Sequence, residues 1–217
     1  MDIISDYIFR IILIGDSSSG KSSFLTRFCT DIFDPNSGNT VGVDFKTKLV
    51  KLEDGKIAKF QIWDTAGQEN FYSICKNYYH YTAAAFLFYD ITNKESFDNV
   101  PKWINRAKEN NKNYESDGNG IIFLIGNKAD LEEKREVSFD NGIIMAQKNR
   151  LLFSEISCKT GISVYSVGER LANEIYEKIK QGKVSVTDTL SGVKNHSVGI
   201  NNININTKMY NGNGYCC

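Results

Sequence analysis

The clearest structural signal in the chain is Gly15-Asp16-Ser17-Ser18-Ser19-Gly20-Lys21-Ser22, which reads G-x-x-x-x-G-K-S between a strand-like run and a helix-like run. Residues 7–14 before it are apolar and rich in branched side chains, as in a buried parallel strand. Apolar residues at positions 24, 25 and 28 after it recur at helical spacing. Such a turn points backbone N–H groups and the positive end of a helix at one spot. The pattern predicts a phosphate-binding loop in which Lys21 reaches the terminal phosphates and Ser22 coordinates Mg²⁺.

The composition excludes several classes of protein. The chain has 217 residues, enough for one α/β domain and a tail, and its 26 basic residues balance 26 acidic ones. It therefore lacks the basic field of a general nucleic-acid binder. No apolar run approaches the roughly 20 residues of a membrane span, and the first residues lack the basic start of a signal peptide. Cys29, Cys75 and Cys158 are isolated and have no metal-ligand spacing. We expect a protein on the cytosolic side.

The remaining periodicity alternates between strands and helices. Residues 30–41 read as a surface loop, and Asp54-Gly55 reads as the turn of an antiparallel hairpin. A Thr92…Glu95 capping box precedes one expected helix over 94–110. The other expected strands are 45–52, 56–63, 83–89, 121–125 and 151–156, and the other helices are 73–80, 140–148 and 164–179. The sequence predicts a three-layer α/β fold with a six-stranded, mostly parallel sheet, one antiparallel edge strand and about five helices.

The composition changes near residue 181. Residues 181–217 are rich in Asn, Ser, Thr and Gly and have no periodic apolar face. We therefore expect a domain over 1–180 followed by a flexible tail. Ligands of such folds bind at the carboxyl ends of the strands, so the loops that follow the strands should carry the chemistry.

Four more stretches fall at strand ends, and with them the chain resembles a Ras-superfamily small GTPase. Asp64-Thr65-Ala66-Gly67-Gln68-Glu69 resembles the switch II motif, and Thr40 resembles the switch I threonine. Asn127-Lys128-Ala129-Asp130 resembles the guanine motif, and Ser157-Cys158-Lys159 the supporting base loop, where Cys158 replaces a common Ala. The resemblance implies Mg²⁺ binding by Ser22, by Thr40 and, through water, by Asp64. It also implies γ-phosphate binding by Gly67 and catalytic roles for Gln68, Lys21 and Thr40.

The base motif also has a physical rationale. The two acceptor oxygens of Asp130 match the N1–H and exocyclic amine of guanine, whereas adenine would leave the carboxylate facing a lone pair. By resemblance, Lys128 and Phe33 would cover the ring faces. Singly, these residues also fit a polar loop, a core position for Phe33 and a helix cap for Asp64. The predicted nucleotide-binding set is Gly15, Asp16, Ser17, Ser18, Ser19, Gly20, Lys21, Ser22, Ser23, Phe33, Thr40, Gly67, Asn127, Lys128, Asp130, Ser157, Cys158 and Lys159.

Within that superfamily the chain most resembles Rab GTPases, over roughly residues 7–180. Residues 41–45, 59–69, 77–79 and 88–92 carry Rab-like segments. The resemblance implies an effector surface of Phe45, Trp63 and Tyr78, with core packing as the alternative. The sequence departs from the Rab pattern at Ser18, Ser37, Asn70 and His80.

The chain ends with Cys216 and Cys217. Two adjacent thiols after a polar tail have no core to join and cannot complete a zinc site, and the ending is not a C-a-a-X box. It resembles the Rab double-cysteine terminus, which receives two geranylgeranyl chains. One lipid gives only reversible membrane binding, and two give stable anchoring.

These observations lead to one functional hypothesis. We expect a monomeric, Rab-like GTPase that binds GTP or GDP with Mg²⁺ and acts in vesicle trafficking. It would cycle between the cytosol and the cytoplasmic face of an intracellular membrane. Its partners would be an exchange factor, a GTPase-activating protein, a prenyl-binding escort of the GDI or REP type, and effectors, with no nucleic acid. A GTP-binding interaction protein without useful turnover is the alternative, and an adenine-nucleotide kinase is opposed by Asp130.

Overall fold

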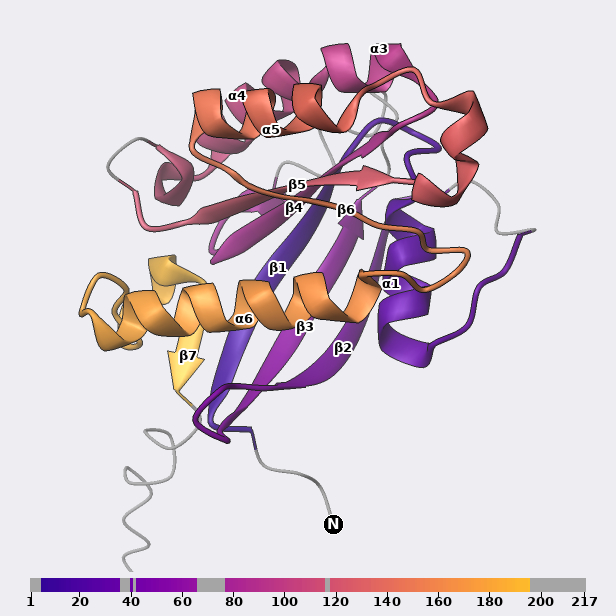
Figure 1. Ribbon diagram of the computed structural model, residues 1–217. Helices are drawn as coiled ribbons and strands as arrows, with labels where there is room; N and C mark the ends of the chain where they lie inside the picture. The colour runs from indigo at the N-terminus through magenta and orange to yellow at the C-terminus, as the bar shows by residue number, and fades with distance from the viewer. Residues whose placement is uncertain (1–4, 36–39, 41, 66–76, 116–117, 196–217) are drawn as a thin grey trace, which may run out of the picture.

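The computed structural model describes residues 5–35, 40, 42–65, 77–115 and 118–195. A single sheet runs through the molecule with strand order β2-β3-β1-β4-β5-β6, and a further strand, β7, pairs with β1 (Figure 1). The strands are β1 (Tyr7–Gly15), β2 (Val43–Lys51), β3 (Ile57–Thr65), β4 (Ala84–Asp90), β5 (Ile121–Asn127), β6 (Leu152–Glu155) and β7 (Val193–Asn195).

Helices cover both faces of this sheet. Figure 1 shows α4 and α5 on one side of the strands, and α1 with α6 on the other. The α-helices are α1 (Lys21–Thr30), α3 (Lys94–Asp98), α4 (Val100–Asn110), α5 (Phe139–Asn149) and α6 (Val164–Lys180), and the 3₁₀ turns are η2 (Lys112–Tyr114), η3 (Ala129–Lys134) and η4 (Thr189–Ser191). In the described ranges, none of the helices has the length and apolarity that a membrane crossing requires.

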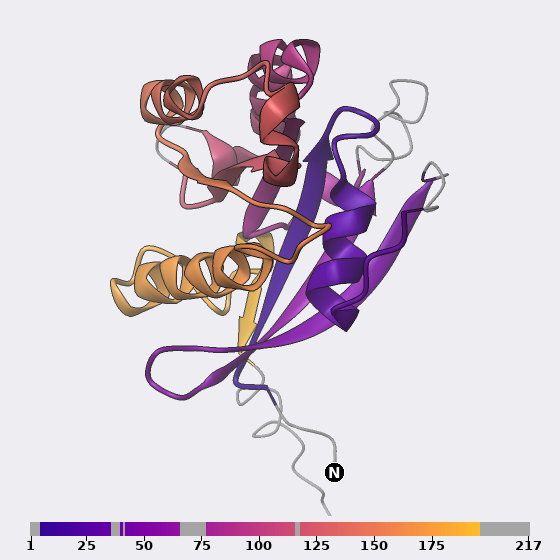
Figure 2. The same ribbon diagram turned by 45° about the vertical axis from the view of Figure 1, so that its right-hand side comes forward.

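The strand pairing confirms the predicted fold class. β2 and β3 form the expected antiparallel hairpin, with Phe45 opposite Trp63, while β3 and β4 both lie parallel to β1. The order of strands reverses between β1 and β4, because the chain moves outward to β3 and β2 on one side and to β4, β5 and β6 on the other. Ligands of open α/β sheets bind at such a switch point. The loop after β1 lies there, at the opposite end of the sheet from β7 (Figure 2).

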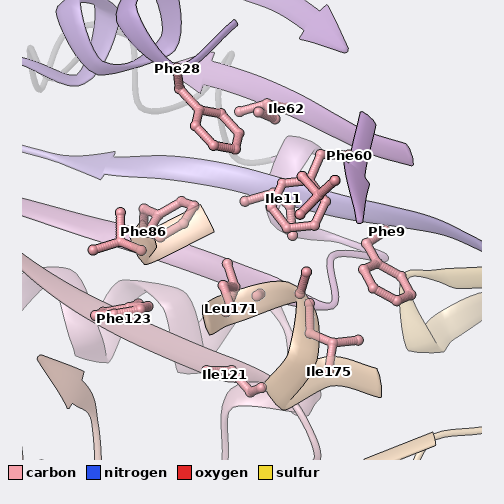
Figure 3. Packing of buried hydrophobic residues seen from close by; sticks show 14 of the residues in the cluster. Phe9, Ile11, Phe28, Phe60, Ile62, Phe86, Ile121, Phe123, Leu171 and Ile175 are labelled. Atoms are coloured by element: carbon pink, nitrogen blue, oxygen red, sulfur yellow. The ribbon is translucent and has the colours of Figure 1, made fainter. Parts of the chain in front are cut away.

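Two apolar clusters hold the layers together. The larger one lies between the sheet and the pair α1 and α6, where Phe28, Leu171 and Ile175 meet the strand residues (Figure 3). The smaller one lies under α4 and α5 and includes Trp103 and Ala146. Because the central strands are buried on both faces, β4 and β5 read as continuous apolar runs.

The predicted helix over 94–110 has the predicted outer bounds, but the structure divides it into two helices. α3 ends at Asp98, and α4 begins at Val100 with Pro101 in its first turn, where the missing N–H of proline costs no hydrogen bond. The predicted Thr92 capping box is wrong. Asn93 caps α3 by accepting from Ser96 N, while the Thr92 hydroxyl donates to Asp90.

The first part of the predicted flexible tail is ordered. β7 pairs antiparallel with Tyr7–Phe9 of β1, in the register Phe9 to Val193, and Val193 is buried. β4 pairs with β1 only from Ile11 onward, so β7 satisfies a length of strand edge that β4 leaves uncovered. No apolar alternation indicates this strand, because Val193 lies between Ser191-Gly192 and Lys194-Asn195. Residues 196–217 lie outside the described residues, as do residues 73–76 of the helix expected over 73–80, of which residues 77–79 are helical.

Candidate functional site

The loop between β1 and α1 depends on two glycines. Gly15 has φ +132°, and a Cβ there would lie 2.3 Å from the Phe88 carbonyl oxygen of β4. Gly20 has φ +93°, and a Cβ there would lie 2.0 Å from Asn127 Nδ2. Both positions therefore require glycine, because any side chain would collide with the neighbouring strand ends. The loop therefore packs closely against the ends of β4 and β5.

Positive charge gathers at this loop. The buried Lys21 ammonium donates to the carbonyl oxygens of Gly15 at 2.8 Å and Asp16 at 2.7 Å. The N-terminus of α1 has no side-chain cap and no acidic residue in its first turn. Its free N–H groups and partial positive charge suit an anion such as a phosphate.

The serines of the loop have different environments. Ser19 is buried, and its hydroxyl donates to Asp16 O at 2.8 Å. Ser17 and Ser18 are exposed. Ser18 has φ +63°, a left-handed conformation that glycine adopts without strain, so the departure at Ser18 carries a backbone cost. Ser23 lies in the first turn of α1 and is partly buried.

The three predicted Mg²⁺ ligands converge from separate elements. Ser22 opens α1, Thr40 belongs to the loop before β2, and Asp64 lies near the end of β3. The Ser22 and Thr40 hydroxyl oxygens are 2.5 Å apart, the Ser22 hydroxyl donates to Asp64 Oδ2, and Thr40 Oγ1 lies 3.4 Å from the same oxygen.

This group fits a magnesium ion. Asp64 is buried, and its Oδ1 has no hydrogen-bond partner in the described part of the protein. Burial raises the pKa of the Asp64 carboxyl, while the Ser22 hydroxyl acts in the opposite direction. Carboxylate and hydroxyl oxygens are the ligands that Mg²⁺ prefers, and a cation would compensate the buried charge.

The base-motif residues are joined to one another and to the phosphate loop. Asn127 is buried at the end of β5, donates from Nδ2 to Ser19 O at 2.9 Å, and accepts from Cys158 N at 3.3 Å. Asp130 accepts from Ser157 Oγ at 2.6 Å through Oδ1. Asn127 therefore connects the loops after β1, β5 and β6, and Ser157 fixes the direction of the Asp130 carboxylate.

The predicted ring-covering residues have partners of their own. Lys128 has φ +67°, and its ammonium pairs with Asp90 Oδ2 at 2.5 Å. Phe33 is half-buried and packs against the larger apolar cluster, so the core alternative accounts for part of its surface. Lys159 is exposed. Stacking of Lys128 and Phe33 on a base stays a prediction.

Cys158 occupies a dry position in the base loop. Its side chain is buried, and its sulfur lies 4.0 Å from Gly20 O. Burial raises the pKa of the Cys158 thiol to about 12. The thiol therefore stays neutral near pH 7 and packs as a small apolar group, as alanine would in this place.

Two of the three residues of the predicted effector surface are exposed. Phe45 is 47% and Tyr78 37% exposed, so core packing is wrong for both, and the ring centroids of Phe45 and the half-buried Trp63 are 5.2 Å apart. His80 is exposed.

Seven residues singled out from the sequence lie outside the described residues, namely Gly67, Gln68, Ser37, Asn70, Cys75, Cys216 and Cys217.

Sequence reasoning missed two neighbours of the phosphate loop, Asn99 and Trp103, whose side chains donate to the Asp16 carboxylate. Asp90, the partner of Lys128, was also missed. Pro101 was an available signal for a helix break near Asn99. Nothing in the sequence pointed to the contact with Asp16.

A family model described as the Ras family matches residues 10–177 of the chain. The match spans most of the described sheet, from β1 to α6, and includes the phosphate loop, Thr40, Asp64 and the base motifs.

Proposed function

Because the chain belongs to the Ras family of small GTPases, we propose that it works as a Rab-like, membrane-anchored switch that binds GTP and hydrolyses it slowly to GDP. Proteins of this family generally bind guanine nucleotides together with Mg²⁺. The observation that carries the proposal is the convergence of Ser22, Thr40 and Asp64 beside the buried Lys21 ammonium. Oxygen ligands next to a cation-lined loop are suited to a metal-bound polyphosphate.

The residues divide the work of binding and hydrolysis. Bound Mg²⁺ would neutralise phosphate charge, with Ser22, Thr40 and Asp64 as its protein-side ligands. Lys21 would hold the terminal phosphates, and the N–H groups of residues 15–22 would surround them. Gln68 would orient the attacking water, so the chemistry consists of positioning and charge neutralisation. Asp130, held by Ser157, would select guanine through its N1–H and amine.

The Rab-like assignment is supported by the signature segments and by the exposed aromatic side chains. Phe45 and Tyr78 lie on the surface, and Phe45 contacts Trp63. β2 and β3 run between the loops that carry Thr40 and Gln68. An exposed aromatic group beside two nucleotide-sensing loops suits recognition by effectors, with an exchange factor and a GTPase-activating protein acting on the same loops.

Single-turnover hydrolysis of bound GTP tests the chemistry. Wild-type protein should hydrolyse GTP slowly, and faster with a cell extract that supplies an activating protein. Gln68→Leu should slow the intrinsic reaction at least about tenfold while GTP stays bound, and Ser22→Asn should shift the preference toward GDP. Hydrolysis by Gln68→Leu at the wild-type rate would contradict the assigned chemistry. No turnover by the wild type under either condition would favour a GTP-binding interaction protein.

Fractionation of the protein from its own cells tests the anchor. With Cys216 and Cys217 both prenylated, the protein should divide between a membrane fraction and a soluble complex with a prenyl-binding escort. Changing both cysteines to Ser should leave it wholly cytosolic with unchanged nucleotide binding, and changing one should weaken membrane binding. Cys29→Ser serves as the control. An unmodified C-terminus on the membrane fraction, measured by intact mass, would refute this part of the proposal.

A further inference from the structure

Two side chains of the α3–α4 region hold the carboxylate of the phosphate loop. Asn99 Nδ2 donates to Asp16 Oδ2 at 2.8 Å, and Trp103 Nε1 donates to Asp16 Oδ1 at 2.6 Å. We name these three residues the Asp16 clamp. Both carboxylate oxygens are engaged, and both donors come from a part of the chain more than 80 residues away in sequence.

The helix side of the Asp16 clamp is firmly placed. Asn99 is the junction between α3 and α4, and its backbone N–H donates to Glu95 O at 3.0 Å. In the N-cap position of α4 its side chain makes no capping bond, because the amide points to Asp16 instead. Trp103, one turn further along α4, is only 5% exposed and has the Arg106 guanidinium 4.9 Å from its ring centroid.

The loop side connects Asp16 directly to Lys21. The carbonyl oxygen of Asp16 accepts from Lys21 Nζ at 2.7 Å and from the Ser19 hydroxyl at 2.8 Å. The side chain of Asp16 thus bonds to α4, while its backbone bonds to the ammonium and to the loop. A change at Asn99 is expected to reach Lys21 through this one residue.

The direction in which the Asp16 carboxylate points affects the electrostatics of phosphate binding. A carboxylate in a phosphate-binding loop repels the ligand if it turns toward the phosphates. Asn99 and Trp103 are neutral donors, so they hold the carboxylate toward α4 without placing a competing cation beside the loop. The positive end of α1 and the Lys21 ammonium then remain available to the phosphates.

We propose that Asn99 and Trp103 are positioning residues for the phosphate loop, and that the Asp16 clamp slows the release of bound nucleotide. The proposal rests on the proposed binding of guanine nucleotides. It assigns to α4 a role in nucleotide retention that acts through Asp16.

Asn99→Asp tests this role with little risk to the fold, because the two side chains have nearly the same size and no capping bond of Asn99 is lost. The new carboxylate would face Asp16 at the distance of the present hydrogen bond, and like charges this close repel strongly. Release of a fluorescent GDP into excess unlabelled GDP should become at least about tenfold faster. Asn105→Asp puts the same charge on an exposed position of α4 and should release GDP at the wild-type rate.

A second change should rescue the first. In Asn99→Asp combined with Asp16→Asn, the amide at position 16 can accept from Trp103 and donate to the new carboxylate, so both hydrogen bonds return with the charge moved to α4. Release should come back to within about threefold of the wild-type rate. If Asn99 only stabilised the junction between α3 and α4, the change at position 16 would not restore the rate of GDP release.

The NMR signal of the Trp103 indole proton reports on its hydrogen bond to Asp16 without a measurement of nucleotide release. In a Trp63→Phe background, its NMR signal should shift upfield and exchange faster with solvent in Asp16→Ala, because the carboxylate acceptor is lost. If the wild-type protein retains GDP and Asn99→Asp releases GDP at the wild-type rate, the role of the Asp16 clamp is contradicted and the proposed function stands. Wild-type protein that retains no guanine nucleotide would overturn the proposed function and the clamp with it.

Discussion

The base half and the phosphate half of the site are built differently. In the base half, which comprises Asn127, Lys128, Asp130, Ser157 and Cys158, each polar side chain bonds to another part of the protein, as in the contacts from Asn127 to Ser19 and from Ser157 to Asp130. In the phosphate half, residues 15–22 with Thr40 and Asp64, charged groups are concentrated. The Lys21 ammonium donates to carbonyl oxygens of the loop. Asp64 Oδ1 is buried and has no hydrogen-bond partner among the described residues.

Because of this difference, base selectivity and switching can be carried by separate parts of one site. The base half is fixed by hydrogen bonds between the rigid ends of β5 and β6, so it can discriminate bases with little rearrangement. In the phosphate half, Asp64 Oδ1 is buried without a hydrogen-bond partner among the described residues, so a bound metal would compensate it and the energy of this half would depend on the ligand. A region whose energy depends on the ligand is the one that can change with the nucleotide state.

The largest effect is expected from Asp130→Asn, which exchanges the acceptor of the base half. The variant should bind xanthosine triphosphate in preference to GTP, because the amide can donate to the carbonyl at C2 of xanthine. The ratio of the two affinities should change by about 10⁴. Competition binding measures it, with the exposed Asp140→Asn as the matched control. An equal loss of both nucleotides would contradict the assigned role.

The next effect tests the phosphate half. Lys21→Ala removes a buried ammonium, so the affinity for GTP should fall by about 10³. The affinity for guanosine, which carries no phosphate, should fall far less. Both are measured by competition, and the exposed Lys148→Ala on α5 is the control. If guanosine binding falls as much as GTP binding, the two halves are not separate.

The thiol of the base half gives a smaller, chemical test. Since the pKa of Cys158 rises from 9.0 to about 12, its thiolate fraction at pH 8 should be about 10³ lower than in the unfolded chain. A more basic thiolate is more nucleophilic, but the thiol is also buried, so reaction with an aromatic disulfide should be at least about 50-fold slower than in urea.

The experiment uses a chain in which the other four cysteines are Ser, and the rate should rise with pH without a plateau below about pH 11. Reaction of the folded protein at the rate seen in urea would show that the base half is open to solvent.

Ser157→Ala should have a milder effect within the base half. It removes the hydrogen bond to Asp130 and the acceptor for Thr160 N, while Asp130 itself remains. The Kd for GTP should rise about tenfold with the preference for guanine retained. Ser166→Ala, on the exposed side of α6, is the control. A change in base preference would mean that Ser157 touches the base directly.

The smallest effect on nucleotide binding is expected from the far end of the sheet. Val193→Ala in β7 should lower the free energy of unfolding by about 2 kcal/mol, because it truncates a buried side chain. GTP affinity should stay at the wild-type value, since β7 lies at the opposite end of β1 from the phosphate loop (Figure 2). Urea unfolding and competition binding measure the two quantities, with the exposed Lys194→Ala as the control.

Local sequence determined most of the strands and the loops of the site. The apolar run of β1, the glycines at 15 and 20, and the polar residues after β3, β5 and β6 act through short-range requirements, namely backbone freedom, strand burial and chain reversal. The sheet brings Ser22, Thr40 and Asp64 together, a group that the sequence predicted through its resemblance to small GTPases.

The remaining features depend on how complete helices and strands pack together. Asp16 meets Asn99 and Trp103 because α4 packs beside the end of β1, and Val193 is buried because β4 starts too late to cover the edge of β1. Each of these contacts joins residues that are distant in the chain and carry no periodic pattern. Local propensity therefore cannot encode them, and the packing of complete elements settles them.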